Sequence, residues 1–138
     1  GFAWMCGGLV NRRLLNLSLM SKMRVAIICA ISLAIIMFMI SLKSENIYTI
    51  LIPAFFMHCL AGFIFNNYFA YCLSMFPRYA GTAGGIAGSG AYVVTFLGSS
   101  ILAGMLPSSA VTSLAAGYFI LAIACWLLYK KINSQIAN

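Results

Sequence analysis

The chain has 138 residues, of which 64% are hydrophobic and 7% are charged, and its mean hydropathy is +1.04. These values exclude a soluble globular domain, in which about a quarter of the residues are charged. The net charge of +7 would suggest nucleic-acid binding in a soluble protein. Here no basic face with interleaved aromatic residues remains once the apolar blocks are placed as helices. We therefore expect membrane topology and anionic lipid headgroups, and not nucleic acid, to account for the charge. The composition predicts an all-α integral membrane protein.

The first ten residues form an apolar run that is too short to cross a bilayer. The chain begins with Gly1 and carries no signal-peptide pattern. We therefore expect this sequence to be the C-terminal domain of a longer protein whose N-terminal half is absent. Residues 1–10 would then form the last turns of a preceding helix that reaches the cytoplasm, and a basic loop at residues 11–24 would follow. That loop could include a short amphipathic helix.

Four apolar blocks follow, and each predicts a membrane-spanning helix. They cover about residues 24–42, 47–76, 81–106 and 109–129. A bilayer core requires about 20 apolar residues per helix. The second block is longer than this, which predicts that it tilts, kinks near Pro53 or extends into the cytoplasm at its C-terminal end. The first block is uniformly apolar, so most of its surface can face lipid.

Threading the four blocks in and out of the membrane gathers seven of the eight basic residues on one face. They are Arg12, Arg13, Lys22, Arg24, Arg78, Lys130 and Lys131. The other face receives Lys43 and Glu45, which is the only acidic residue. Short loops with this bias mark the basic side as cytoplasmic. We therefore expect a multi-pass protein of the cell's inner (plasma) membrane with a cytoplasmic C-terminus.

The block at 47–76 differs from the others because it contains several polar residues. Four of them are candidates for lining a substrate cavity: His58, Asn66, Asn67 and Tyr71. Polar side chains in hydrocarbon raise the free energy unless they find partners or line a wet cavity, so this helix should face the protein interior. His58 is either a hydrogen-bonded packing residue or a proton relay or substrate contact. Asn67 and Tyr71 either bond between helices or contact substrate, and we expect one of the two asparagines to bond to the glycine-rich helix that follows.

Small residues recur four apart in the block at 81–106. Gly81, Gly84, Gly85 and Gly88 are therefore candidates for close helix packing, since small side chains allow two backbones to approach. A second interpretation is a helix that slides or bends during a transport cycle, and the low helix propensity of glycine is compatible with both.

No pattern in the sequence indicates catalysis. The five cysteines are scattered and form no Cys-x-x-Cys pair, which is typical of packing residues and not of a disulfide or zinc framework. There is no nucleophile triad, metal-ligand cluster or phosphate-binding loop. We therefore expect no enzymatic activity, no metal and no cofactor.

The residues Gly7-Gly8-Leu9-Val10-Asn11-Arg12 resemble the cytoplasmic-loop motif of the major facilitator superfamily, Gly-x-Leu-x-Asp-Arg-x-Gly-Arg-Arg. The matching positions are Gly7, Leu9, Asn11 and Arg12, with Asn11 in place of the aspartate. The weakened second copy of the motif, between the eighth and ninth spans, is the better match. The resemblance implies that the chain runs from the end of span eight through span twelve of a twelve-helix bundle. It also implies that Arg12 is a cytoplasmic latch, although Asn11 supplies no negative partner; the plain alternative is a topogenic charge beside lipid headgroups.

The segment Asn66-Asn67-Tyr68-Phe69-Ala70 and the junction Phe76-Pro77-Arg78-Tyr79-Ala80-Gly81-Thr82-Ala83 resemble the Bcr/CflA branch of drug:proton antiporters. This resemblance implies export of a small, often amphipathic molecule, driven by proton re-entry. The implied partners are the N-terminal half of the same transporter, the substrate, protons and membrane lipids. Coupling acids in such transporters commonly lie in the N-terminal half, and here the single acid, Glu45, falls in an outer turn. The alternative function is that of a small, non-transporting membrane accessory or remnant protein.

Overall fold

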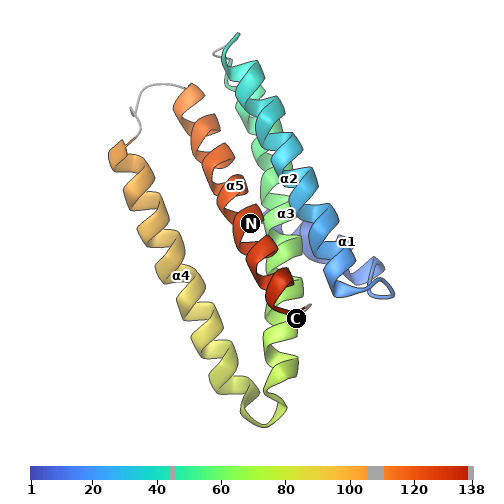
Figure 1. The fold of residues 1–138 in the computed structure, drawn as a ribbon. Coiled ribbons are helices and arrows are strands. Elements are labelled where there is room, and N and C mark those ends of the chain that lie inside the picture. The colour runs from blue at the N-terminus through green and yellow to red at the C-terminus, as the bar shows by residue number, and fades with distance from the viewer. Residues whose placement is uncertain (44–45, 106–110, 137–138) are drawn as a thin grey trace.

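The computed structural model describes residues 1–43, 46–105 and 111–136, which form helices and no strand. The helices in this part of the chain are α1 (Phe2–Arg13), α2 (Leu19–Ser41), α3 (Tyr48–Met75), the short 3-10 helix η1 (Pro77–Tyr79), α4 (Ala80–Met105) and α5 (Val111–Ile136) (Figure 1). Four of them, α2 to α5, are long and apolar enough to cross a membrane. The expected all-helical class is therefore confirmed for the described residues, and the four long apolar helices support the expected multi-pass membrane protein. Glu45 and the expected turn at 107–108 lie outside the described residues.

The start of α2 is set by a side-chain cap. Ser18 has an extended backbone, and its hydroxyl oxygen accepts a hydrogen bond from the backbone N–H of Ser21 at 3.3 Å. Such a cap gives a partner to an N–H that the first turn of a helix leaves unpaired. The helix therefore begins at Leu19 and not near residue 24. Lys22 and Arg24, which we expected in a loop, lie in the first turns of α2, and the connecting loop is reduced to residues 14–18.

α3 is the longest helix of the described chain, with 28 residues. At about 1.5 Å per residue it measures about 42 Å, which exceeds the roughly 30 Å of a hydrocarbon core. It continues as a helix through Pro53 and ends at Met75. Pro77 then occupies the first position of η1, where a missing backbone N–H carries no penalty. This junction reverses the chain direction into α4.

α2 and α5 lie side by side and run in opposite directions. The Tyr129 hydroxyl donates to the carbonyl oxygen of Met20 at 3.4 Å, and the Thr112 hydroxyl donates to that of Ser41 at 3.4 Å. These bonds join opposite ends of the same helix pair. Fully buried small residues, including Ala34 of α2 and Ala115 of α5, accompany this contact. Alanine side chains at these positions allow the two helices to approach closely.

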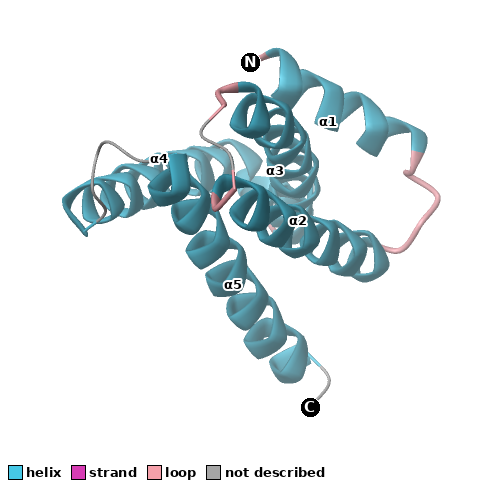
Figure 2. Ribbon diagram, turned by 90° about the horizontal axis from the view of Figure 1, so that it is seen from above, coloured by secondary structure: helices cyan, strands magenta, loops and turns pink. Residues whose placement is uncertain are grey.

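α1 and α4 lie on different sides of this arrangement (Figure 2). α1 packs extensively against α3, whereas α4 borders α3 and η1. No residue of α4 is buried in the described structure, in contrast to α2, which buries six. The glycine-rich helix is thus the most exposed of the four candidate spans.

Seven basic residues gather toward one end of the bundle, which we call the basic end. Arg12 and Arg13 end α1, Lys22 and Arg24 lie in the first turns of α2, Arg78 lies in η1, and Lys130 and Lys131 lie near the end of α5. Two hydrogen bonds tie these helix ends together: Lys22 Nζ to Asn11 Oδ1 at 3.4 Å, and Tyr129 to Met20. The fold therefore brings together the residues that the charge pattern assigned to one face.

Candidate functional site

A cleft of about 220 Å³ opens between α2, α3 and α5 near the basic end. Its lining residues are Leu19, Met20, Met23, Ile27, Ile64, Tyr68, Tyr71, Cys125, Leu128 and Tyr129. Three tyrosines, two methionines and a cysteine are thus combined with four aliphatic side chains. The lining offers aromatic faces and polarizable sulfur atoms without a charged group.

Helical spacing explains how each wall of the cleft is built. On α3, Ile64, Tyr68 and Tyr71 follow one another at intervals of four and three residues, which places them on one face. On α5, Cys125 and Tyr129 are four residues apart and share a face in the same way. The hydrogen bond from Tyr129 to α2 then holds α5 beside the remaining wall.

The chemistry of this lining suits an amphipathic molecule. Tyr71 is 38% exposed and Tyr68 is 51% exposed, so both rings are accessible. Aromatic faces attract cations, and they bury apolar surface at the same time. Methionine side chains adapt to occupants of irregular shape. Within the described residues, no three His, Cys, Asp or Glu side chains gather as a metal site would require.

Of the four predicted cavity residues, Tyr71 alone lines this cleft. His58 is exposed on α3, and its Nδ1 lies 2.8 Å from the carbonyl oxygen of Ala54. Because a carbonyl oxygen only accepts hydrogen bonds, we assign the proton to Nδ1, which leaves Nε2 as a hydrogen-bond acceptor. The ring also makes an edge contact with Tyr118 of α5, with centroids 6.1 Å apart. His58 thus has a structural bond within its own helix and an accessible ring.

The two asparagines point to neither the cleft nor α4. Asn67 is 3% exposed, and its Nδ2 donates to the carbonyl oxygen of Phe63 at 2.8 Å, one turn back in the same helix. The Nδ2 atom of Asn66 faces α1, 3.0 Å from the position that a Cβ on Gly8 would take. The expected bond from one of them to the glycine-rich helix is therefore absent from the described structure. A hydrogen bond to a carbonyl oxygen of the same helix gives the buried amide of Asn67 a partner, so no second helix is needed.

The loop-motif residues Gly7, Leu9, Asn11 and Arg12 lie on a helix and not in a loop, because α1 continues to Arg13. Asn11, which stands where the motif has its aspartate, accepts a hydrogen bond from Lys22. The neutral amide at this position is therefore still paired with a cationic side chain. Arg12 is exposed and pairs with no acidic group among the described residues. The latch role of Arg12 remains a prediction.

The predicted packing glycines have few neighbours in this chain. A Cβ at Gly84 would meet Leu73 and Phe69 of α3 at 3.3 and 3.4 Å. Gly81, Gly85 and Gly88 face open space within 4 Å. Their role in close helix packing remains a prediction.

Sequence reasoning missed a close approach between α1 and α3. A Cβ at Gly7 would overlap the carbonyl oxygen of Cys59, and one at Gly62 would lie 2.5 Å from the carbonyl oxygen of Trp4. These glycines let α1 cross directly over α3. At Gly7 the available signal was its spacing of four residues from Ala3, and at Gly62 it was a glycine inside an apolar helix, but neither was assigned a packing role.

Sequence reasoning also missed most of the cleft. Tyr68 stands three residues before Tyr71, and this spacing could have placed both on one face. Tyr129 stacks on Trp126 of the same helix, with ring centroids 6.0 Å apart. Its place in the cleft depends on the α2–α5 pairing, which no local pattern encodes.

No known protein family, curated protein or solved structure matches this chain. Four of its helices have the length and apolarity that a membrane-spanning helix requires.

Proposed function

We propose that this chain forms part of a secondary transporter that moves small amphipathic molecules across the inner membrane of the cell. The observation that carries the proposal is the uncharged cleft at the basic end, lined by Tyr68, Tyr71 and Tyr129. A metabolite with several charges would find no countercharge there. An amphipathic molecule would bury apolar surface against the aromatic rings and the methionines.

The motifs of the major facilitator type make the C-terminal portion of a proton-coupled exporter the best candidate within this class. The direction of α1 supports this assignment. Phe2 lies against Phe55 with ring centroids 6.3 Å apart, and Gly8 lies beside Asn66, so the contacts advance in the same direction along both helices. α1 therefore runs parallel to α3, as the last turns of a span that ends on the same side would do.

The proposed orientation places the basic end in the cytoplasm, because short loops rich in Lys and Arg remain on that side. Tyr129 and Trp126 then form an aromatic belt at the cytoplasmic interface, next to Lys130 and Lys131. The cleft lies near the cytoplasmic ends of α2, α3 and α5 in this orientation. An exporter would load its substrate from that side.

The test is an export assay in cells that express the protein together with any coding sequence upstream of Gly1, with ethidium as the amphipathic cation. We expect Tyr71→Leu to slow ethidium efflux by about ten-fold, which corresponds to about 1.4 kcal/mol of lost aromatic interaction. Tyr71→Phe keeps the ring and should retain most of the efflux. Tyr48→Leu is the matched control, because Tyr48 is an exposed tyrosine at the other end of α3.

Equal efflux for the wild type and Tyr71→Leu at equal membrane levels would contradict a substrate role of the cleft. Absence of ethidium efflux, and of any drug protection, from the wild-type protein would favour the non-transporting accessory role.

A further inference from the structure

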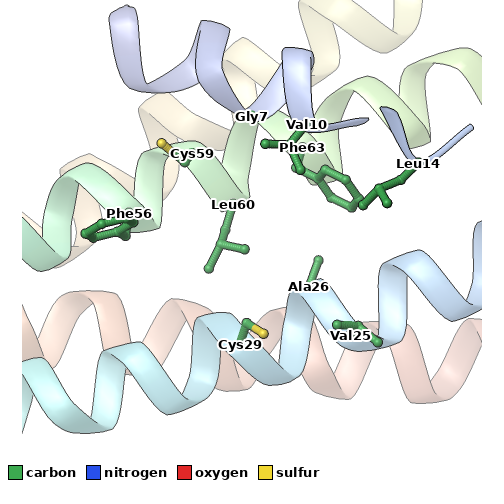
Figure 3. A pocket seen from close by; sticks show the side chains of 10 residues that line it. All are labelled: Gly7, Val10, Leu14, Val25, Ala26, Cys29, Phe56, Cys59, Leu60 and Phe63. Atoms are coloured by element: carbon green, nitrogen blue, oxygen red, sulfur yellow. The ribbon is translucent and has the colours of Figure 1, made fainter. Parts of the chain in front are cut away.

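A groove separate from the substrate cleft lies between α1, α2 and α3. Its volume is about 300 Å³, and its lining consists of apolar side chains and cysteines. In Figure 3, Phe56 and Leu60 of α3 line one wall, and Ala26 and Cys29 of α2 line the other. Val10 of α1 lies beside Phe63, on the α3 side of the groove. We call this the apolar groove.

The apolar groove continues into a positively charged surface at the basic end. Val10 also lines a shallow hollow of about 460 Å³ whose other residues are Leu9, Arg12 and Arg13. On the facing helix, Arg24 directly precedes Val25 of the groove. All three arginines are exposed, and none pairs with an acidic group among the described residues. The apolar groove therefore borders Arg12 and Arg13 through Val10, which lines both hollows.

Lys22 adds a buried positive charge at the same place. It lies on α2 three and four residues before Val25 and Ala26, so it occupies the same helix face, one turn closer to the basic end. Its side chain is 8% exposed, and Nζ donates to Asn11 Oδ1 at 3.4 Å. A single neutral amide does not compensate a buried charge. Glu45, the only acidic side chain of the sequence, follows the opposite end of α2.

We propose that this surface binds one anionic phospholipid, with an acyl chain in the apolar groove and the phosphate against Lys22, Arg12 and Arg13. A lipid is the occupant that fills the groove and the rim at once, because it joins hydrocarbon to phosphate. Basic pockets between membrane helices on the cytoplasmic side recognise anionic headgroups in this way. A zwitterionic headgroup would bring a positive charge to a rim that already lacks anions. The proposal is independent of the transport function.

The test is native mass spectrometry of the full chain in detergent, titrated with dioleoyl phosphatidylglycerol. Dioleoyl phosphatidylcholine tests the headgroup, and glycerol 1-phosphate tests whether free phosphate suffices. We expect one phosphatidylglycerol to be retained per chain, with affinity at least about five-fold above phosphatidylcholine, and no retained glycerol 1-phosphate. Equal retention of phosphatidylcholine, or retention of glycerol 1-phosphate alone, would overturn the proposal.

Single substitutions test whether the phospholipid binds at the apolar groove and the neighbouring basic residues. Arg13→Gln changes an exposed rim residue and should weaken phosphatidylglycerol binding about five-fold. Lys22→Gln should weaken it at least as much, but its burial makes the Arg13 variant the deciding one. Cys29→Phe fills the groove and should also reduce binding. The matched control is Lys131→Gln on α5, which carries the same change of charge at the basic end. A loss with Lys131→Gln equal to that with Arg13→Gln would show that binding follows net charge alone and would overturn the site.

Discussion

Two polar residues of α3, only four positions apart, have different surroundings. Tyr71 lines the cleft, whereas Asn67 is buried and bonded to its own helix. We therefore expect Asn67→Leu to leave ethidium efflux within about two-fold of wild type while lowering the free energy of unfolding by about 1 kcal/mol, the usual contribution of one hydrogen bond. Efflux and unfolding in detergent would be measured on the same preparations. A loss of efflux as large as that of Tyr71→Leu would place Asn67 in the substrate path instead.

The α1–α3 crossing depends on the absence of a side chain at Gly62. A methyl group there would lie 2.5 Å from the Trp4 carbonyl oxygen, and backbone atoms cannot yield as a flexible side chain can. Gly62→Ala should therefore lower the free energy of unfolding by about 1–3 kcal/mol, as overpacking does. Gly104→Ala is the control, because a Cβ at Gly104 meets open space and alanine favours the helix. Thermal melts of both variants measure the difference, and equal melting temperatures would contradict the close crossing.

At the scale of the helix, the start of α2 depends on Ser18. Removing its hydroxyl leaves the Ser21 N–H without its partner, so Ser18→Ala should cost about 1 kcal/mol of stability. Ser18→Asp keeps a capping oxygen and should retain stability. Ser32→Ala, an exposed change in the middle of α2, serves as the control. Denaturant titration followed by circular dichroism would rank the stabilities of these variants and the wild type. A Ser18→Ala variant as stable as wild type would show that the cap does not set the start of α2.

Helix existence was predictable from the sequence because continuous apolar blocks of this length have few alternatives in a bilayer. Boundaries were less predictable at charged positions. Lys22 and Arg24 were assigned to a loop on account of their charge, but the Ser18 cap and the bond to Asn11 accommodate them on α2. Contacts between helices were the least predictable. The glycine series of α4 suggested close packing, whereas Gly7 and Gly62 provide the close approach of α1 to α3. Small residues permit close packing but do not specify which helix is the neighbour.

The candidate site was likewise only partly predictable from the sequence. Tyr71 could be identified as an intramembrane polar residue. The cleft partners Met20 and Tyr129 could not, since they come from helices that pair at a sequence distance of more than a hundred residues.

At the scale of the whole molecule, the described spans contain no carboxylate, and the only acidic residue is Glu45. Proton coupling through a titrating carboxylate therefore requires the proposed N-terminal half. We expect liposomes that contain residues 1–138 alone, loaded at acidic internal pH, to show no substrate-stimulated proton flux with a pH-sensitive dye. Flux that ethidium stimulates, and that His58→Gln abolishes, would instead assign the coupling group to His58.

The topology of the helices underlies both the cleft and the apolar groove. Single cysteines at Asn16 and Ser44, in a chain whose five native cysteines are replaced by alanine, can be probed on intact cells with a membrane-impermeant maleimide. Position 16 belongs to the loop at the basic end, and position 44 follows α2 at the opposite end. We predict labelling at position 44 in intact cells, and at position 16 only after the membrane is permeabilised. Labelling of position 16 but not position 44 in intact cells would contradict a cytoplasmic basic end.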